Sequence, residues 1–394
     1  MNILQTISSM DPAFGGTVEG VKQLGMTLRS QGHNVEIASM DDPDAKYLKA
    51  CSLPVYPLGP ARFSYAFSPR FIPWLRENRS RYDAIIVNGI WQFHSFATWK
   101  TLHNSTTPYF LFTHGMLDPW FKKRYPLKHV KKWMYWPWAE YRVLRDAQAV
   151  LFTCEEERLL ARQSFWLYRC NEVVVNYGTA VPTGDPQAEL DEFFELYPGL
   201  RGKKLALFMG RIHPKKGCDL VIEAFAAVVA RHSDWHLVIA GPDSVGWQAK
   251  LQHRVQQLGI ASKITWTGMT SGAIKWGALR AAEVFILPSH QENFGIVVAE
   301  ALAAGTPALI SNKVNIWREV QTDGAGMVAE DTLAGACGLF RSYLDLSQEK
   351  KLAMSQMTRR CFEQRFEIKK AAANMHALLS NVLATSTSST HAYN

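Results

Sequence analysis

The chain has 394 residues, 47% of them hydrophobic and 20% charged, enough apolar material for about two globular domains. Its net charge of +8 favours an anionic partner, but no zinc-finger or RNA-binding motif accompanies it, so nucleic acid is not expected as a partner. The six cysteines have no metal-binding spacing, and the chain shows neither a secretory leader nor an apolar run of about 18 residues. The sequence therefore predicts a cytoplasmic protein with reduced thiols.

Short apolar runs alternate with helical patterns along the chain, which is typical of parallel sheets covered by helices. In the first half these runs predict strands at 2–7, 34–39, 83–88, 108–113, 148–153 and 171–175. In the second half they predict strands at 204–209, 235–240, 263–267, 283–287, 307–310 and 325–329. Helical patterns fall at 16–31, 217–231, 247–258 and 270–281. Two series of strands separated by a break predict an α/β fold with two Rossmann-like domains rather than one barrel.

The break lies at 178–203, where glycines and prolines flank an acidic stretch. This composition predicts a linker with a peripheral helix. We therefore expect an N-terminal domain over 1–180 and a C-terminal domain over 200–364. The run of serine and threonine near the end predicts a flexible tail over 384–394.

Glu292 and Glu300 stand eight residues apart, just after the predicted strand 283–287. Residues 296–304 are apolar apart from Glu300, so they predict a buried helix whose carboxylate needs hydrogen-bond donors. Gly295 lets the backbone approach a ligand closely, and the amides at the helix start favour an anion. This pattern fits a ligand that is part polyol and part phosphate.

A second motif, Gly210-Arg211-Ile212-His213-Pro214-Lys215-Lys216-Gly217, follows the predicted strand 204–209 and opens a helical pattern. A strand, a glycine turn and a helix start form a phosphate cradle in α/β proteins. Arg211 offers a planar fork and Lys216 a point charge, which together suit a diphosphate. The spacing matches neither a Walker loop nor the dinucleotide fingerprint. Two merely solvated cations are disfavoured, because cations at a helix start oppose the dipole unless an anion is bound.

Three features of the N-terminal half follow predicted strands. Gly15 and Gly16 come after the first strand, where a phosphate-binding turn and a plain turn both remain open. His114 follows the strand at 108–113. Asp118 either orients this histidine or meets an acceptor, but a cap on the helix that begins near Pro119 is the favoured interpretation.

Residues 119–145 carry eight basic residues against one acidic residue, with four tryptophans interleaved. The segment opens with Trp120, Lys122, Lys123 and Arg124. Such a composition suits an acceptor or an anionic membrane surface, at about 1 kcal/mol per cation near the lipid. A buried aromatic core with solvated lysines explains it equally well.

Together these motifs resemble the retaining glycosyltransferases of family 4, which have the GT-B fold of two Rossmann-like domains facing across a cleft. That family carries a Glu-x7-Glu element and a Gly-Arg-x4-Lys-Gly element, and both occur here with matching spacing and order. The family's N-terminal Gly-Gly loop is also present. The resemblance extends from Met1 to about residue 380.

The resemblance implies a role for each motif residue. Arg211 and Lys216 hold the donor diphosphate, Glu292 and His114 contact the donor sugar, and Glu300 accepts the ribose hydroxyls. His114, Arg211, Lys216 and Glu292 are therefore the expected catalytic residues. The remaining donor-binding positions are backbone turns and loop residues: Gly15, Gly16, Gly210, Gly241, Gly268, Met269, Asn293, Phe294, Gly295 and Ile296. In such enzymes a C-terminal helix, here at about 365–383, packs back on the first domain.

The expected function is hexose transfer from a nucleotide diphosphate sugar to a glycan or lipid-linked sugar, without a metal or other cofactor. UDP-glucose is favoured over GDP-mannose, and peripheral attachment to the inner face of a membrane remains open. A nucleotide-sugar epimerase on the same fold and a non-catalytic sugar-nucleotide-binding protein are the alternatives. The residues specify neither the base, the sugar, the acceptor nor the linkage.

Overall fold

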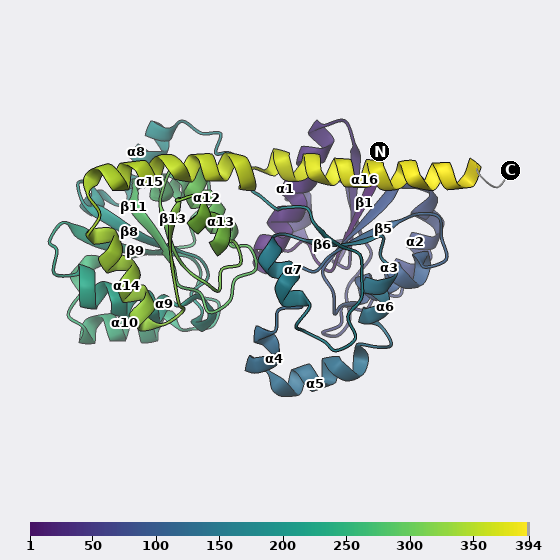
Figure 1. Cartoon of the computed structure of the whole chain (residues 1–394), viewed down its shortest axis with the longest axis horizontal. Helices are drawn as coiled ribbons and strands as arrows, with labels where there is room; N and C mark the ends of the chain where they lie inside the picture. Colours follow the sequence, from purple (N-terminus) through teal and green to yellow (C-terminus); the bar gives the residue numbers. More distant parts are fainter. Residues whose placement is uncertain (392–394) are drawn as a thin grey trace. The chain divides into compact units, whose positions relative to one another are not determined.

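The computed structural model describes residues 1–391, without the side chains of Lys123 and of residues 386–391. The chain forms two compact units, of which one is Met1–Gly178 with the segment from Ile368 onward and the other is Thr179–Glu367. Each unit is a parallel sheet with helices on its faces (Figure 1). The prediction of two Rossmann-like α/β domains is confirmed.

Within the described residues, the sheet of the first unit has seven parallel strands in the order β3-β2-β1-β4-β5-β6-β7. The strands are β1 (Asn2–Ile7), β2 (Asn34–Ser39), β3 (Val55–Pro57), β4 (Ala84–Asn88), β5 (Tyr109–Phe112), β6 (Ala149–Phe152) and β7 (Glu172–Val174). The sequence did not predict β3. It is a three-residue edge strand that ends in proline, and proline is tolerated only at such an edge.

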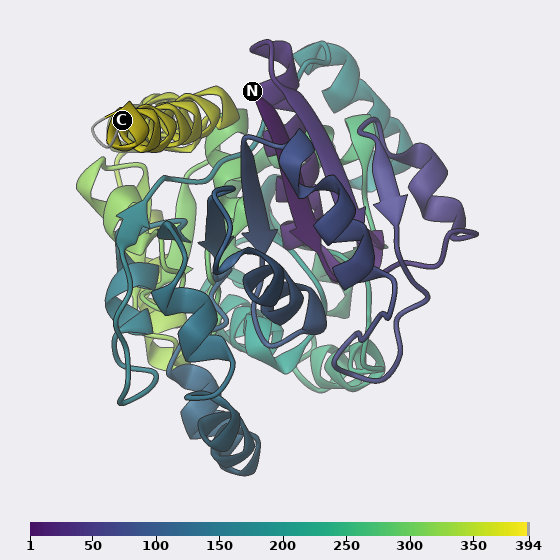
Figure 2. The ribbon, with the colours of Figure 1, turned by 90° about the vertical axis from the view of Figure 1, so that its right-hand side faces the viewer.

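Helices of the first unit follow most of its strands. They are α1 (Gly16–Ser30), α2 (Phe71–Asn78), α3 (Phe93–Leu102), α4 (Trp120–Arg124), α5 (Pro126–Tyr135), α6 (Glu140–Arg145), α7 (Glu155–Ala161) and α16 (Ile368–His391). Helices α4 and α5 project below the sheet in both ribbon views (Figure 1 and Figure 2). None of the described helices is both long enough and apolar enough to cross a membrane.

Helix α16 belongs to the first unit, where it packs against α1. His376 Nδ1 lies 2.9 Å from His33 Nε2, and Ala372 and Met375 are buried. The helix runs to His391, so residues 384–391 of the expected tail are helical, and the flexibility of this segment stays a prediction. The Thr385 hydroxyl hydrogen-bonds to helix carbonyls one turn earlier, so a polar residue continues the helix instead of ending it. Residues 392–394 of the expected tail lie outside the described residues.

The sheet of the second unit has six parallel strands within the described residues, in the order β10-β9-β8-β11-β12-β13. The strands are β8 (Lys204–Met209), β9 (Trp235–Ala240), β10 (Ile264–Gly268), β11 (Ala282–Leu287), β12 (Ala308–Ser311) and β13 (Gly326–Ala329). The helices are α8 (Pro186–Leu196), α9 (Cys218–Ala224), α10 (Gln248–Gln257), α11 (Gly272–Ala281), α12 (Ile296–Ala304), α13 (Trp317–Thr322), α14 (Leu333–Leu344) and α15 (Gln348–Cys361). The helix predicted at 217–231 is α9 followed by a π-helical turn at Phe225–Val229.

Helix α8 is an integral part of the second unit, although the sequence left its residues between the domains. Arg280 on α11 forms a buried ion pair with Glu189 on α8, with Nε and Oε2 2.6 Å apart. A side chain at Gly277 would lie 2.1 Å from the Glu189 carbonyl oxygen, so the two helices approach closely because α11 has a glycine there. The second unit therefore begins at Thr179.

Candidate active site

Three glycine turns lie side by side where β8, β9 and β10 end. Gly210, Gly241 and Gly268 all have positive φ, and the Gly241 amide donates to the Gly268 carbonyl at 2.7 Å. A Cβ at Gly241 would lie 1.8 Å from the Gly210 carbonyl oxygen, so only glycine fits. Backbone therefore forms this edge of the sheet, which is where open α/β sheets bind their ligands. Met269, next to these turns, has an exposed side chain.

The loop after β8 packs on the loop after β11. Gly217 is left-handed, and a Cβ there would lie 2.4 Å from the Pro288 carbonyl oxygen. The His290 amide donates to the Lys215 carbonyl at 2.8 Å. These contacts bring together the two motifs that the sequence singled out 76 residues apart, counted from Lys216 to Glu292.

Lys216 and Glu292 form an ion pair in which both side chains are mostly buried. Burial and the neighbouring Lys215 and Arg211 lower the pKa of the Lys216 ammonium. Direct contact with the Glu292 carboxylate opposes that shift and favours the charged form. Arg211 itself is exposed.

The loop that carries Glu292 is held by main-chain hydrogen bonds to the turn after β12. The Glu292 amide donates to the Lys313 carbonyl at 2.9 Å, and its carbonyl accepts from the Asn315 amide at 3.0 Å. Phe294 is buried and packs edge-on against Phe366. Gly295 adopts a left-handed conformation as the N-cap of α12, and no side chain caps the helix.

Gly295 supplies no side-chain acceptor, so the Ile296 and Val297 amides at the start of α12 can face an anion. The Val298 amide donates to the Gly295 carbonyl at 2.7 Å. Ile296 is the first residue of the helix. Two residues before the N-cap, Asn293 Oδ1 lies 3.5 Å from Asn315 Nδ2. The predicted donor-binding positions 293–296 therefore surround the start of α12.

Glu300 lies in the middle of α12, which is buried as the sequence predicted. Its Oε1 is 2.8 Å from the Nζ of Lys275 on α11. The sequence indicated that a buried carboxylate needs a donor, but it did not identify Lys275. That pairing depends on the packing of α11 against α12, for which local sequence carries no signal.

His114 occupies a strained position at the end of β5 in the first unit. Its φ is +46°, its ring stacks on Phe112, and its Nε2 is 3.1 Å from Asn88 Oδ1. Burial and the nearby His94 lower the pKa of His114 to about 3, so the imidazole is neutral near pH 7. Asn88 Oδ1 is an acceptor, so the proton of the neutral ring lies on Nε2, and Nδ1 can accept one further hydrogen bond.

The other N-terminal candidates lie at helix starts. Gly15 has a φ of +72° and is the N-cap of α1, whose first residue is Gly16. Asp118 Oδ1 accepts a hydrogen bond from the Trp120 amide at 2.8 Å, so it lies beside the start of α4, but the N-cap of that helix is Pro119 rather than Asp118. Lys122 and Arg124 are exposed on α4, and the side chain of Lys123 lies outside the described residues.

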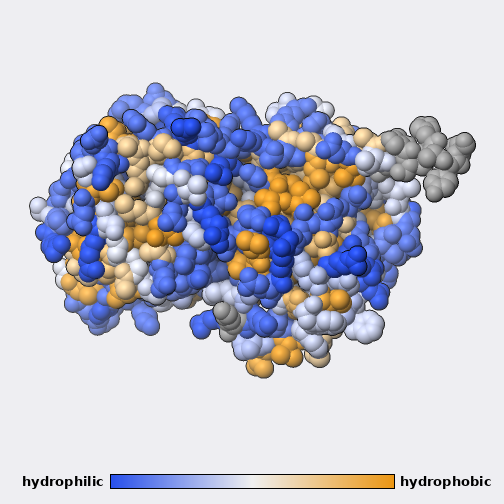
Figure 3. Space-filling view, viewed as in Figure 1, coloured by the Kyte–Doolittle hydropathy of each residue, from blue (hydrophilic) through white to orange (hydrophobic). Residues whose placement is uncertain are grey.

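Helix α5 carries exposed apolar and basic side chains together. The exposed large hydrophobic residues on and just after the helix are 48% to 86% exposed, and orange side chains gather there at the bottom of Figure 3. We define the α5 surface as the exposed residues Leu127, Lys128, Val130, Lys131, Trp133, Met134 and Trp138. Trp136 is different, since it is fully buried and stacks on Phe165 at 4.2 Å. The aromatic segment is thus part core and part surface.

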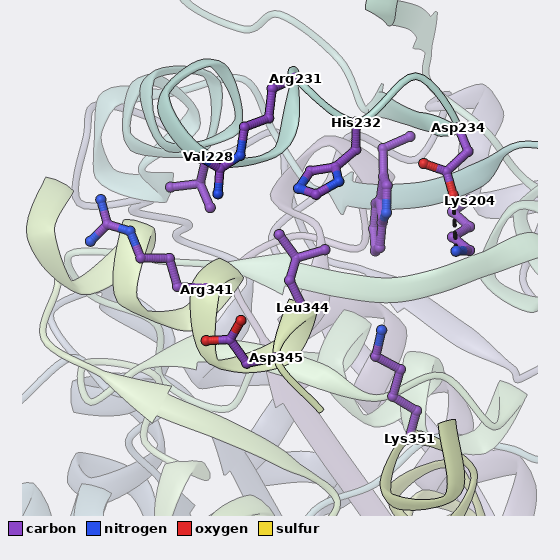
Figure 4. Close-up of a pocket in the computed structure, with 10 residues that line it drawn as sticks. Lys204, Val228, Arg231, His232, Asp234, Arg341, Leu344, Asp345 and Lys351 are labelled. Carbon is purple, nitrogen blue, oxygen red and sulfur yellow. Dashed lines mark ion pairs between the residues drawn. The ribbon is translucent and has the colours of Figure 1, made fainter. Parts of the chain in front are cut away.

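A hollow of about 260 Å³ lies at the opposite edge of the second sheet, where β8 and β9 begin (Figure 4). Lys204 and Asp234 form an ion pair of 2.9 Å on its rim. This edge is opposite to the glycine turns, so the hollow is separate from the candidate site. Among the described residues, no cluster of three or more His, Cys, Asp or Glu residues could hold a metal.

Two family models match the chain. Residues 15–178 match the model described as glycosyl transferase 4-like domain, and residues 196–345 match glycosyl transferases group 1. These two ranges contain the glycine turns, the ion pair and His114.

One curated relative and two solved structures match almost the full length of the chain, and a second curated relative matches about four fifths of it. The chain is 26% identical over 390 residues, 96% of each protein, to a GDP-mannose-dependent alpha-(1-6)-phosphatidylinositol dimannoside mannosyltransferase of Mycobacterium tuberculosis. It is 27% identical to a phosphatidyl-myo-inositol mannosyltransferase of Mycobacterium leprae, over 79% of this chain and 78% of that protein. The crystal structure of Anabaena HepE in complex with UDP has a TM-score of 0.77 at 16% identity, over 97% and 100% of the two chains. Sucrose-phosphate synthase from Thermosynechococcus elongatus has a TM-score of 0.76 at 19% identity, over 98% and 100%.

These matches agree with the two parallel sheets and with the motifs at their edges. The chain belongs to the family 4-like glycosyltransferases of GT-B fold, and it is a hexosyltransferase.

Proposed function

We propose that this protein transfers a hexose from a nucleoside diphosphate hexose to a hydroxyl group of a glycan or lipid-linked sugar, with retention at the anomeric carbon. The observation that carries the proposal is the Lys216–Glu292 pair beside the uncapped start of α12. It combines a cation, the amides of a helix start and a hydroxyl acceptor within one short stretch of the sheet edge.

The diphosphate of the donor is bound by Lys216, the exposed Arg211 and the first amides of α12. As the anomeric C–O bond breaks, negative charge accumulates on the leaving phosphate, and these donors stabilise it. They supply the positive charge that a metal ion supplies elsewhere, so the proposed reaction needs no metal.

The carboxylates of Glu292 and Glu300 accept hydrogen bonds from hydroxyl groups of the donor. When Lys216 turns to the phosphate, Glu292 becomes free to accept hydrogen bonds from the hexose. Glu300 accepts the ribose hydroxyls, while the Lys275 ammonium, 2.8 Å from its Oε1, balances the charge of the buried carboxylate.

His114 contributes a neutral imidazole to the sugar rather than a general acid, because its pKa lies far below the working pH. The proposal assigns no protein nucleophile, so departure of the phosphate and attack by the acceptor occur on one face of the sugar. NMR of the product tests this: an anomeric configuration opposite to that of the donor contradicts retention.

For the donor we favour GDP-mannose, with UDP-glucose second. The full-length relative from M. tuberculosis is named as GDP-mannose-dependent, whereas the UDP complex of HepE supports the fold at only 16% identity. Thermal shift against GDP, UDP and ADP tests the order, since a ligand at about 100 times its Kd stabilises the fold by about 2.7 kcal/mol. Radiolabelled GDP-mannose and UDP-glucose then identify which hexose is transferred. Stabilisation by none of the nucleotides contradicts the proposed donor site.

An epimerase on the same fold would convert the donor sugar without an acceptor. Incubation with the donor alone separates the two functions, because an epimerase yields a new nucleotide sugar and a transferase does not.

We also propose that the α5 surface rests on an anionic membrane at the cytoplasmic face. No acidic residue occurs from Pro119 to Ala139, and no residue of α5 is buried. Apolar side chains flanked by lysines match an interface with acyl chains below and phosphate headgroups beside them. A lipid-linked acceptor would be reached from that position.

A further inference from the structure

The buried carboxylate of Glu157 hydrogen-bonds to the residues on both sides of His114. Glu157 lies in the first turn of α7 and is 2% exposed. Its Oε1 accepts hydrogen bonds from the Thr113 hydroxyl at 2.7 Å and from the Gly115 amide at 2.6 Å. The two residues on either side of His114 are therefore held by one oxygen atom.

The other oxygen of Glu157 is tied to the neighbouring strand. Its Oε2 accepts from the Thr153 amide at 2.8 Å and from the Thr153 hydroxyl at 2.6 Å. Thr153 follows β6 and Thr113 follows β5, and these strands are adjacent and parallel. The carboxylate thus joins the ends of two strands with four hydrogen bonds.

These hydrogen bonds explain how His114 keeps an unfavourable backbone conformation. A non-glycine residue in the left-handed region costs about 1–2 kcal/mol, and such strain persists only where surrounding contacts hold it. Two turn hydrogen bonds support the loop, from the Met116 amide to Thr113 and from the Asp118 amide to Gly115. Both are accepted by backbone carbonyls of the residues that Glu157 holds, Thr113 and Gly115.

We propose that Glu157 is a positioning residue, which holds the Thr113–Gly115 backbone so that His114 presents its imidazole to the donor sugar. The inference rests on the role of His114 in the proposed hexose transfer. Glu157 itself touches no substrate in this account, and it acts only through the loop that it holds.

Glu157→Gln is the informative substitution, because it preserves size and removes one backbone hydrogen bond of the four. One oxygen becomes an NH₂ group, which then faces either the Gly115 amide or the Thr153 amide. Both are donors, so one backbone hydrogen bond is lost in either orientation. Glu155→Gln, in the same helical turn, is the matched control, since Glu155 pairs with Arg158 instead.

A double-mutant cycle of kcat/KM with His114→Ala tests whether Glu157 acts through His114. We expect Glu157→Gln to lower kcat/KM about 10-fold or more in the native background and less than about 3-fold in the His114→Ala background. Equal factors in both backgrounds, or no loss from Glu157→Gln, overturn the inference. Should Glu157→Gln fail to fold, Thr113→Val removes one of the four donors and is carried through the same cycle.

A second measurement needs no substrate and keeps this inference separate from the proposed function. In ¹H–¹⁵N spectra of the histidine rings, we expect His114 to remain neutral with its proton on Nε2, bonded to Asn88, from about pH 5 to 8. In Glu157→Gln we expect an average of tautomers or a titration within that range, and no change in Glu155→Gln. An unchanged His114 spectrum in Glu157→Gln overturns the inference. An altered spectrum in Glu157→Gln, together with a wild-type chain that transfers no hexose, overturns only the proposed function.

Discussion

The Lys216 ammonium and the Glu292 carboxylate neutralise each other across two loops, one following β8 and the other following β11. Their side chains are 14% and 19% exposed. Each charge is therefore mostly removed from water and depends on the other. In the proposed reaction the donor diphosphate takes the place of Glu292 beside Lys216.

Lys216→Met and Glu292→Gln separate the stabilising role of this pair from its chemical role. Either change alone leaves one buried charge without its partner, which destabilises the fold. We expect each to cost at least about 2–3 kcal/mol of transition-state stabilisation, a loss of roughly 30-fold to 150-fold in kcat/KM. The double variant is expected to recover the melting temperature and to remain inactive. Near-normal turnover in either single variant contradicts the assigned roles.

Glu300→Gln tests whether Glu300 binds the ribose hydroxyls of the nucleotide. The wild-type chain is expected to bind GDP or UDP more tightly than the 2′,3′-dideoxy nucleotide, because the deoxy sugar leaves the buried Glu300 without its hydroxyl donors. The variant is expected to lose about 10-fold or more in nucleotide affinity and most of this discrimination. Isothermal titration calorimetry measures both. Glu223→Gln, which breaks a surface pair with Arg254 in the same unit, is the control and is expected to bind as the wild type does. Full discrimination in Glu300→Gln means that the ribose is bound elsewhere.

Most strands of this fold can be predicted from local patterns of apolar residues, and the strand that was missed has a physical reason. Buried parallel strands are continuous apolar runs, so twelve of the thirteen described strands were predicted, whereas β3 is too short and too rich in proline to be distinguished from a loop. The buried helix with Glu300 was predicted because a lone carboxylate in an apolar run is unusual.

The contacts of the site were less predictable, because they join distant segments. The sequence singled out Lys216 and Glu292 separately, but it held no signal that they pair. Lys275 and Glu157 were missed because a lysine or glutamate on a helix is usually solvated, and only the packing of neighbouring elements makes each the partner of a functional side chain.

Chelation tests the absence of a metal from the proposed mechanism. If Arg211, Lys216 and the amides of α12 carry the phosphate charge, then hexose transfer is expected to be unchanged after dialysis against EDTA and unaffected by added Mg²⁺ or Mn²⁺. Initial rates with the identified donor measure this. A loss that Mg²⁺ or Mn²⁺ restores would show that the diphosphate requires a metal ion in addition to these residues.

Glu140 gives a pH dependence of stability with a defined sign. Burial raises the pKa of this carboxyl group from 4.5 to about 8, and its Oε1 accepts from the Trp91 amide. Between these pH values the folded chain keeps a proton that the unfolded chain has lost, so this group lowers stability as the pH rises. Glu140→Gln keeps the acceptor and removes the titration. We expect its melting temperature, relative to the wild type, to increase steadily from about pH 5 to pH 8. A constant difference across that range contradicts a buried, protonated Glu140.

The α5 surface yields a prediction about membranes that separates its apolar and its charged residues. Vesicle flotation is expected to recover the wild-type chain with anionic vesicles and not with neutral ones. Lys128→Gln with Lys131→Gln removes two exposed cations and is expected to weaken binding about 30-fold, at about 1 kcal/mol each, with the loss fading at high salt.

Leu127→Glu with Met134→Glu removes two exposed apolar side chains from the same helix and is expected to abolish binding at any salt concentration. Leu352→Glu, at a similarly exposed position on α15, is the control and is expected to float as the wild type does. Because none of these residues belongs to the donor site, transfer to a soluble acceptor is expected to be unchanged in all three variants. If the wild type floats with neither kind of vesicle, the α5 surface has another role. If the wild type floats, and the two α5 double variants lose only transfer to a lipid-linked acceptor, the α5 surface serves to bring the enzyme to its acceptor.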